Sequence, residues 1–446
     1  MPSPVPGTAR SIALRLLRHT RGGTLLLREA DGTEHRFGAA TPDSGPSRLD
    51  AELHLHDDRV WTSFLRGSLG IGDSYAEGRW SSPDLVTLVA LGARNMPAFD
   101  RLRTRFSPLL VPVQRITNGT RNTVARARHQ ISAHYDLSND FFALFLDPTM
   151  SYSCAVFEPP TLDLHAAQIE KIDRLCRKLR LEPGMRLLEI GTGWGALAIH
   201  AARHYGVHVT TVTISREQHA LAQKRISAAG LDDRIDLRLQ DYRDVGGTYD
   251  RIVSVEMIEA VGWRDFPTFF AQCDARLSPD GLVAIQAIAI DDRAYEAEKR
   301  GRSFINVRIF PGGCLPSSAE MAACVAERTR LHPLASEDLT PHYAETLRRW
   351  RARYTEARPA VAELGYDERF RRLWDLYLAY CQAGFQERRI RLVQDVYAGP
   401  EYAATGYAPA ARQADLPLAP PKPAAPSAAR LPSATMSSFD ASARSS

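Results

Sequence analysis

Apolar and polar positions divide the chain into regions of different periodicity. Near the start, residues 23–28, 34–37 and 51–56 are strand-like, and residues 83–91 have helical spacing. In the centre, apolar runs of strand length alternate with segments of helical length. Such alternation predicts a parallel, doubly wound sheet with ligands at the carboxyl ends of its strands.

The central alternation follows a helical stripe that ends at Pro183-Gly184. We predict strands at 185–190, 207–214, 235–242 and 282–290 and a strand that opens the segment 249–262, with helices at 216–229 and 265–277 between them. Polar candidates at the strand ends are Glu189, Thr213, Asp241, the segment 256–259 and the segment 286–288. Beyond Cys314 the pattern is mainly helical, with long segments at 343–358 and 368–396.

The length of 446 residues suggests two domains, or one large domain with additions. We predict a small α+β N-terminal domain over residues 1–100, a basic linker over 101–130, and an α/β domain over 131–400. Residues 401–446 are rich in Pro, Ala and Ser and bury too little apolar surface to fold, so we expect a disordered tail.

Charge and composition narrow the classes of partner. A net charge of only +4 indicates no nucleic-acid partner, and six cysteines without CxxC spacing predict neither a metal site nor disulfides. No apolar run approaches the roughly 20 residues that span a bilayer, and no signal peptide is present, so we expect a cytoplasmic or peripheral protein. Seven arginines without an acidic residue among them form either a solvated linker or a patch for anionic lipid head groups at the inner membrane face. They are Arg101, Arg103, Arg105, Arg115, Arg121, Arg126 and Arg128.

A glycine-rich turn joins the first central strand to the next helix. Gly191, Gly193 and Gly195 follow the apolar run directly, and glycines there let the backbone approach a ligand closely. The spacing is not the Gly-x-Gly-x-x-Gly dinucleotide fingerprint, and the next strand ends in Thr213 without a carboxylate. With Glu189 inside it, the turn resembles motif I of the S-adenosylmethionine-dependent methyltransferases.

Several further segments, in order from about residue 70 to 397, resemble the cyclopropane-fatty-acyl-phospholipid synthases and their mycolic acid relatives. They are YDLSNDFFALFLDPTMSYSCAVF, LEIGTGWG, TVTISREQ, QDYRD, VSVEMIEAVG and FPGGCLPS. The resemblance implies a Rossmann-like class I methyltransferase sheet with helical additions over 131–400. It also implies S-adenosylmethionine as donor, and the double bond of an unsaturated acyl chain in a phospholipid bilayer as acceptor. The N-terminal domain is then expected to face lipid.

Cofactor-binding positions also follow from the resemblance. Thr213 and Gln218 can offer hydrogen bonds in place of the missing carboxylate. The full implied set is Tyr152, Ser153, Glu189, Gly191, Gly193, Gly195, Thr213, Gln218 and Tyr242.

The reaction requires a base as well as a donor. An alkene is a weak nucleophile, so the donor must be held close to it in a dry site, and methyl transfer leaves a carbocation. Aromatic side chains at 135–157 and in the last helices are either core or a source of cation stabilisation. The resemblance implies bicarbonate as the base that then removes a proton. It is held at positions matching Cys154, Glu259, Gln286, Tyr343 and the Ile288 backbone.

Two departures from the family pattern bear on the product. The family commonly has Glu-His-Val-Gly where this chain has Glu259 followed by Ala260, and His-Thr-Ile where it has Gln286-Ala287-Ile288. This variant resembles the branch that makes methylene-branched precursors of 10-methyl fatty acids, completed by a flavin- or NADPH-dependent reductase. A cyclopropane product, a small soluble acceptor, a non-catalytic lipid-binding role and a homodimer remain open alternatives.

Overall fold

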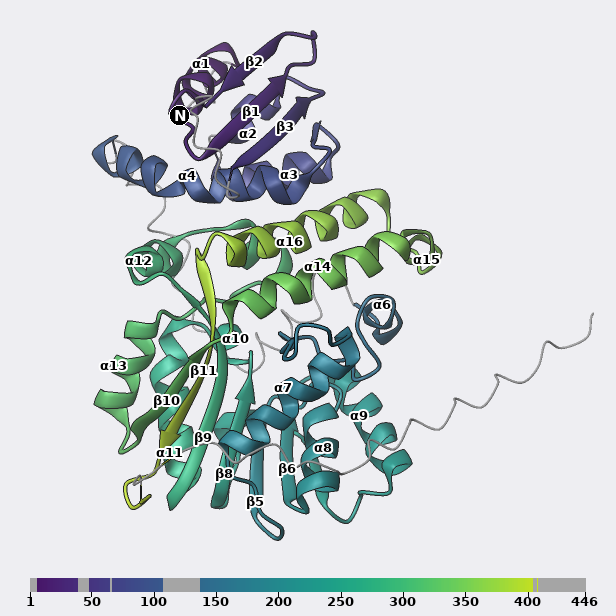
Figure 1. Cartoon of the computed structure of the whole chain (residues 1–446), viewed down its shortest axis with the longest axis vertical. Coiled ribbons are helices and arrows are strands. Elements are labelled where there is room, and N and C mark those ends of the chain that lie inside the picture. Colours follow the sequence, from purple (N-terminus) through teal and green to yellow (C-terminus); the bar gives the residue numbers. More distant parts are fainter. Residues whose placement is uncertain (1–5, 39–47, 65, 107–136, 404–406, 408–446) are drawn as a thin grey trace, which may run out of the picture. The chain divides into compact units, whose positions relative to one another are not determined.

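The computed structural model describes residues 6–38, 48–64, 66–106, 137–403 and 407. The chain from Met1 to Arg412 forms one compact unit that contains two separate sheets (Figure 1). Beyond residue 106, the predicted basic linker lies outside the described residues. The first residues of the predicted linker, 101–106, belong to the end of helix α4 (Leu85–Phe106).

The N-terminal residues form a four-stranded sheet in the order β2-β1-β3-β4. Strand β1 pairs antiparallel to β2 and parallel to β3, and buried Leu25 and Leu27 alternate along it with more exposed residues. The elements are α1 (Pro6–Leu17), β1 (Gly23–Arg28), β2 (Glu34–Phe37), β3 (Leu49–Leu55), α2 (Val60–Phe64), α3 (Gly67–Ala76), β4 (Trp80–Ser81) and α4 (Leu85–Phe106).

The second sheet has seven strands in the order β10-β11-β9-β8-β5-β6-β7. The neighbouring pairs from β9 to β7 are parallel, as predicted. The strand order reverses between β8 and β5, and ligands bind at such a reversal in open α/β sheets. The strands are β5 (Arg186–Ile190), β6 (His208–Thr213), β7 (Ile235–Leu239), β8 (Tyr249–Val255), β9 (Leu277–Ile290), β10 (His332–Asp338) and β11 (Ile390–Ala398).

Helices cover both faces of this sheet (Figure 1). Successive strand residues point to opposite faces, so Leu187 packs with α7, α8 and α9, whereas Leu188 packs with α11 and α13. The Rossmann-like fold class is therefore confirmed. The helices are α7 (Leu164–Lys178), α8 (Ala196–Tyr205), α9 (Arg216–Ala229), α10 (Ile258–Val261), α11 (Phe266–Arg276), α12 (Asp292–Arg300) and α13 (Ser318–Arg328).

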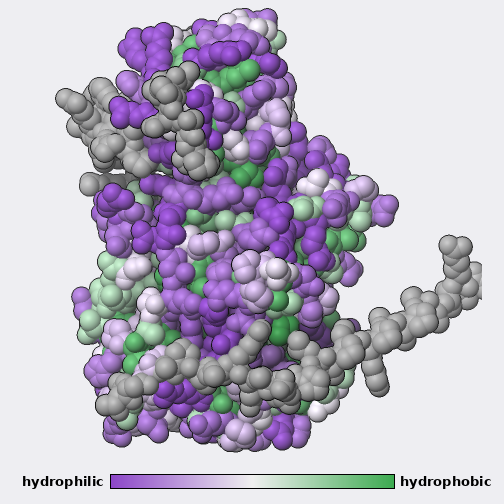
Figure 2. Space-filling model, in the orientation of Figure 1, coloured by the Kyte–Doolittle hydropathy of each residue, from purple (hydrophilic) through white to green (hydrophobic). Residues whose placement is uncertain are grey.

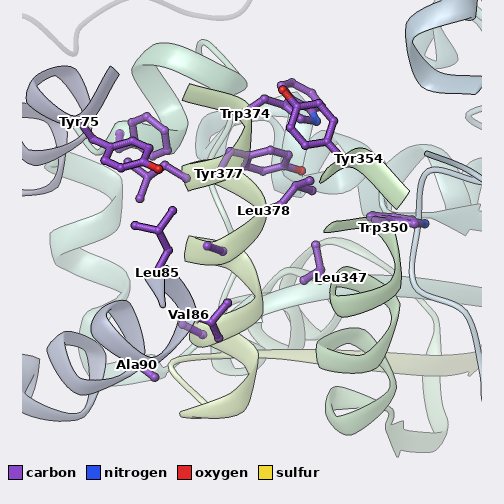
Figure 3. Packing of buried hydrophobic residues seen from close by; sticks show 14 of the residues in the cluster. Tyr75, Leu85, Val86, Ala90, Leu347, Trp350, Tyr354, Trp374, Tyr377 and Leu378 are labelled. Carbon is purple, nitrogen blue, oxygen red and sulfur yellow. The ribbon is translucent and has the colours of Figure 1, made fainter. Parts of the chain in front are cut away.

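Four further helices build the region beyond the carboxyl ends of the strands. They are α6 (Asn139–Ala143), α14 (Thr340–Glu356), α15 (Arg358–Glu363) and α16 (Glu368–Gln386). Figure 3 shows α16 packed between Tyr75 and Leu85 of the N-terminal elements and Leu347 and Trp350 of α14. A second contact joins the N-terminal elements to the segment 305–309, where Arg308 forms an ion pair with the buried Asp73 of α3.

The predicted helix over 368–396 is wrong in its last third. Helix α16 ends at Gln386, Arg388 takes a left-handed φ of 51°, and β11 then returns through the sheet between β9 and β10. A helix was predicted because the aromatic pattern of α16 runs into the apolar residues of β11 without a glycine or proline. The predicted tail is also too long, since the Tyr407 hydroxyl donates to the Lys178 carbonyl at 2.7 Å.

The surface seen in Figure 2 is mostly hydrophilic, with apolar residues in small separate groups. Within the described residues, no helix combines the length and the hydropathy needed to cross a membrane.

Candidate active site

The glycine turn forms the floor of the site at the carboxyl end of β5. Gly191, Gly193 and Gly195 have φ of 102°, 52° and 85°, in the region that favours glycine, and α8 begins directly after them. A Cβ added to Gly193 would meet nothing within 4 Å. The turn therefore borders open space in which a cofactor can reach the backbone.

The polar residues predicted beside this turn lie on β5, β6 and α9. Glu189 is buried and accepts from the Thr211 hydroxyl, and burial raises its pKa to about 8. The Thr213 hydroxyl donates to Gln218 Oε1 at 2.9 Å. The Ser215 hydroxyl oxygen caps α9 by accepting from the backbone N–H of Gln218. Thr213 and Gln218 thus stand together at the end of β6.

The segment before α7 and the turn after β7 supply three more predicted residues. The Tyr152 hydroxyl lies 2.7 Å from that of Tyr377, and its ring lies 5.3 Å from that of Trp350. Ser153 Oγ accepts from Lys171 Nζ at 2.8 Å. Tyr242 has a buried hydroxyl that is bonded to none of the described residues.

A second carboxylate, Glu256, lies at the centre of the predicted catalytic residues. Its Oε1 accepts from the Cys154 backbone N–H at 2.9 Å and from Gln286 Nε2 at 2.7 Å. Its Oε2 accepts from the Tyr343 hydroxyl at 2.5 Å. Cys154, Gln286 and Tyr343 are thus brought together around a single anion, which belongs to the chain itself.

Gln286 is held in its orientation by a chain of side chains. It is fully buried, and its Oε1 accepts from Gln394 Nε2 at 2.8 Å. Gln394 Oε1 in turn accepts from Lys178 Nζ at 2.7 Å. The amide NH₂ of Gln286 therefore points to Glu256.

Glu259 and Ile288 form a separate contact beside this group. The Ile288 N–H donates to Glu259 Oε1 at 2.5 Å, while Glu259 Oε2 is buried and bonded to none of the described groups. Burial and the neighbouring Glu256 raise the pKa of Glu259 to about 8. With this pKa Glu259 is mainly a carboxylic acid at neutral pH. The three donors around Glu256 favour its charged form.

The Cys154 side chain does not point to this anion. Its Sγ–H donates to the Ala155 carbonyl at 3.1 Å, and burial raises the thiol pKa well above its usual value. The contribution of Cys154 to the anion site is its backbone N–H. The segment predicted at the end of β8 includes Glu256, but the resemblance implied a role for Glu259 alone. The only sequence signal for Glu256 is its place at the end of a strand.

The doubly wound sheet, the glycine turn and the polar residues at the strand ends define a class I S-adenosylmethionine-dependent methyltransferase. Residues 122–395 match the family model described as mycolic acid cyclopropane synthetase. The chain belongs to this family.

Its relatives include the tuberculostearic acid methyltransferase UfaA1 of Mycobacterium tuberculosis, which is 42% identical over 401 residues that cover 88% of this chain and 92% of UfaA1. The cyclopropane-fatty-acyl-phospholipid synthase of Escherichia coli K12 is 38% identical over 369 residues, covering 81% of this chain and 90% of that enzyme. Mycolic acid cyclopropane synthase CmaA1, solved in complex with SAH and CTAB, superposes with a TM-score of 0.57 at 33% identity, over 61% of this chain and 98% of CmaA1.

Proposed function

We propose that this enzyme transfers a methyl group from S-adenosylmethionine to the double bond of an unsaturated acyl chain in a phospholipid, and that the product carries a methylene branch. The observation that carries the proposal is the anion site at the carboxyl ends of β8 and β9, formed by Glu256, Gln286 and Tyr343. A methyltransferase for an amine or phenol needs no base of this kind to remove a proton bound to carbon. Family membership and the names of the two sequence relatives support the lipid acceptor.

The residues of the glycine turn suit the donor. S-Adenosylmethionine, when bound, supplies a methyl group on a positively charged sulfur. The open space over Gly193 and the unpaired Tyr242 hydroxyl fit a ligand at this edge of the sheet. We assign its binding to Tyr152, Ser153, Glu189, Gly191, Gly193, Gly195, Thr213, Gln218 and Tyr242.

Aromatic side chains enclose the neighbouring space. The Tyr152 ring lies 5.1 Å from Phe142 and 5.3 Å from Trp350, and Tyr377 packs against Trp374 at 4.9 Å. Phe141 and Phe145, from the same segment, are fully buried and serve the core. The partly exposed Phe142 and Tyr152 are the rings available to exclude water and to stabilise a cation.

Bicarbonate, the base implied by the family, does not fit this site. Two of the groups expected to donate to it, Gln286 and Tyr343, already donate to Glu256, as does the Cys154 N–H. The Ile288 N–H is bonded to Glu259. A second anion would have to displace a side-chain carboxylate from its donors, so bicarbonate takes no part in the reaction proposed here.

The product is tested with vesicles of oleoyl phospholipid and isotopically labelled methyl donor. Mass spectrometry of the released acyl esters is carried out before and after hydrogenation under conditions that spare a three-membered ring. A methylene product gains two hydrogens, whereas a cyclopropane gains none. Methyl transfer to soluble nucleophiles without transfer to lipid would refute the proposal.

The lipid surface and the fate of the product add two tests. If the arginines at 101–128 bind anionic head groups, vesicle binding weakens as salt is added. Binding that does not respond to salt would exclude that role. A methylene branch is also the form that a flavin- or NADPH-dependent reductase saturates, so co-incubation with such a reductase should yield the methyl-branched chain.

A further inference from the structure

We propose that Glu256 itself is the catalytic base: its carboxylate takes the proton that leaves the acyl cation, at the place where a bound anion was expected. The proposal rests on the proposed function and deepens it. It assigns a role to a residue that the family resemblance did not carry over.

The hydrogen bonds to Glu256 indicate a site built for a carboxylate. All three partners, the Cys154 N–H, the Gln286 amide and the Tyr343 hydroxyl, are donors. A carboxylate offers about four lone-pair positions, so one position on Oε2 remains for an incoming proton. As whole residues, Glu256, Tyr152 and Ile288 are half-buried and not part of the closed core.

Gln286 is the last member of a chain of hydrogen bonds in which every group donates toward Glu256. The Lys178 ammonium donates to Gln394, Gln394 donates to Gln286, and Gln286 donates to Glu256. A second ammonium, that of Lys171, lies near enough to favour the charged form of Glu256. Each of these contacts would be weaker if Glu256 were neutral.

The backbone at Glu256 supports a functional role. Its φ of 49° lies in the left-handed region, which glycine adopts freely and other residues adopt only at a cost in free energy. Glycine would be the less strained residue at this position. The side chain that this backbone directs is the one that meets the three donors.

Glu259 completes the site as a neutral neighbour. Two carboxylates this close do not both ionise readily, and Glu259, with a single donor and a pKa of about 8, keeps its proton at neutral pH. Glu256, with three donors against one, is the carboxyl whose charged form the site stabilises more.

In the step that forms the methylene product, a proton passes from the new methyl group to Glu256. After methyl transfer and a shift of hydride from the methyl-bearing carbon to its neighbour, the cation lies on the methyl-bearing carbon. A C–H bond of the methyl group breaks, its electron pair forms the exocyclic C=C bond, and the proton binds Glu256 Oε2. The neutral carboxylic acid then returns its proton to water.

Holding the carboxylate by three hydrogen bonds also limits a side reaction. A carboxylate that moved toward the cation would form an ester with it. To do so, Glu256 would have to break its bonds to Cys154, Gln286 and Tyr343. Proton transfer requires no such movement.

The test compares the wild type, Glu256→Gly and Glu256→Gln in buffer freed of carbon dioxide, with and without added bicarbonate or formate. Wild-type transfer to oleoyl phospholipid vesicles should not depend on the added anion. Glu256→Gly should lose roughly 10²–10⁴-fold in rate and recover with either anion. Glu256→Gln fills the same space without a base, so it should be slow in all buffers.

Arg180→Gly is the matched control, because Arg180 has the same φ of 49° but precedes the opposite, amino-terminal end of β5. It should remain independent of bicarbonate. Binding of ¹³C-labelled bicarbonate, followed by NMR, gives a readout apart from activity: Glu256→Gly should bind the ion, and the wild type should not.

A wild type that requires bicarbonate, or Glu256→Gln at the wild-type rate, would overturn the proposal. If Glu256→Gly fails to fold, these two measurements still decide. Failure of the proposed function looks different: the wild type then transfers no methyl group to lipid in any buffer, while the bicarbonate-binding comparison still reports whether Glu256 occupies the anion position.

Discussion

Replacing Tyr343 by Phe removes one of the three hydrogen bonds to Glu256 and leaves the ring in place. The Tyr343 side chain is buried and donates to Glu256 Oε2 at 2.5 Å. A hydrogen bond to a charged group contributes about 1.5–3 kcal/mol. One pKa unit corresponds to about 1.36 kcal/mol, so the pKa of Glu256 should rise by about 1–2 units from its already raised value.

The hydrogen bond from Tyr343 stabilises the charged form of Glu256, so its loss raises the Glu256 pKa. Burial raises the pKa of Glu256 and is the largest influence on it. Four groups act against burial and lower this pKa: the Tyr343 hydroxyl, the Cys154 N–H, the Gln286 amide and the Lys171 ammonium. The reactive form is the carboxylate. The acid limb of kcat/KM against pH should therefore move to higher pH by about 1–2 units in Tyr343→Phe, with little change of rate above the limb.

The assay is a pH–rate profile with labelled methyl donor and oleoyl phospholipid vesicles. Tyr354→Phe is the control, since Tyr354 lies on the same helix and its hydroxyl donates to the Arg371 carbonyl at 3.1 Å. That variant should lose stability without moving the limb. An acid limb at the same pH in Tyr343→Phe and wild type would refute the assignment of Glu256 as the titrating base.

Three further predictions concern single residues. Because the Glu259 pKa is about 8, wild-type activity should fall above pH 8, where a second charge forms beside Glu256. In a pH–rate profile, Glu259→Gln should keep its activity at pH 7 and should not show this fall. Gln286→His should raise the cyclopropane fraction measured by mass spectrometry, because it changes how the base is held; an unchanged ratio would count against that role. Asp73→Asn weakens two hydrogen bonds from Arg308 to a buried carboxylate and should lower the free energy of unfolding by about 1–3 kcal/mol, seen as a lower thermal midpoint; no shift would show that this contact adds no stability.

The parallel part of the sheet could be predicted because its signals are local. The apolar run before Gly191 and the glycines after it determine β5, the turn and the start of α8 from consecutive residues. Strand β11 has no such local signal, since its place depends on pairing with β9, a hundred or more residues earlier in the chain. Its apolar residues continue the pattern of α16, and a turn of three residues with the left-handed Arg388 at its centre separates the two elements.

At the proposed catalytic carboxylate, too, local sequence predicts the approximate position but not the residue that acts. The strand-end rule placed both Glu256 and Glu259 at the edge of the sheet. Which of the two meets Gln286 and Tyr343 depends on the left-handed backbone at Glu256, which directs its side chain to the donors. A backbone angle of this kind at a non-glycine residue cannot be predicted from local composition, because other residues adopt it only where the surrounding structure imposes it.

The tethered base and the glutamine at position 286 form a consistent pair. A diffusible anion has to be captured from solution, and a cationic histidine would help to capture it. A carboxylate attached to β8 is already present, so a neutral amide oriented by Gln394 is sufficient to position it. Three donors also make the carboxylate a weaker base than it would be without them. A weaker base removes the methyl proton more slowly, which leaves time for the hydride shift that separates the methylene product from the cyclopropane.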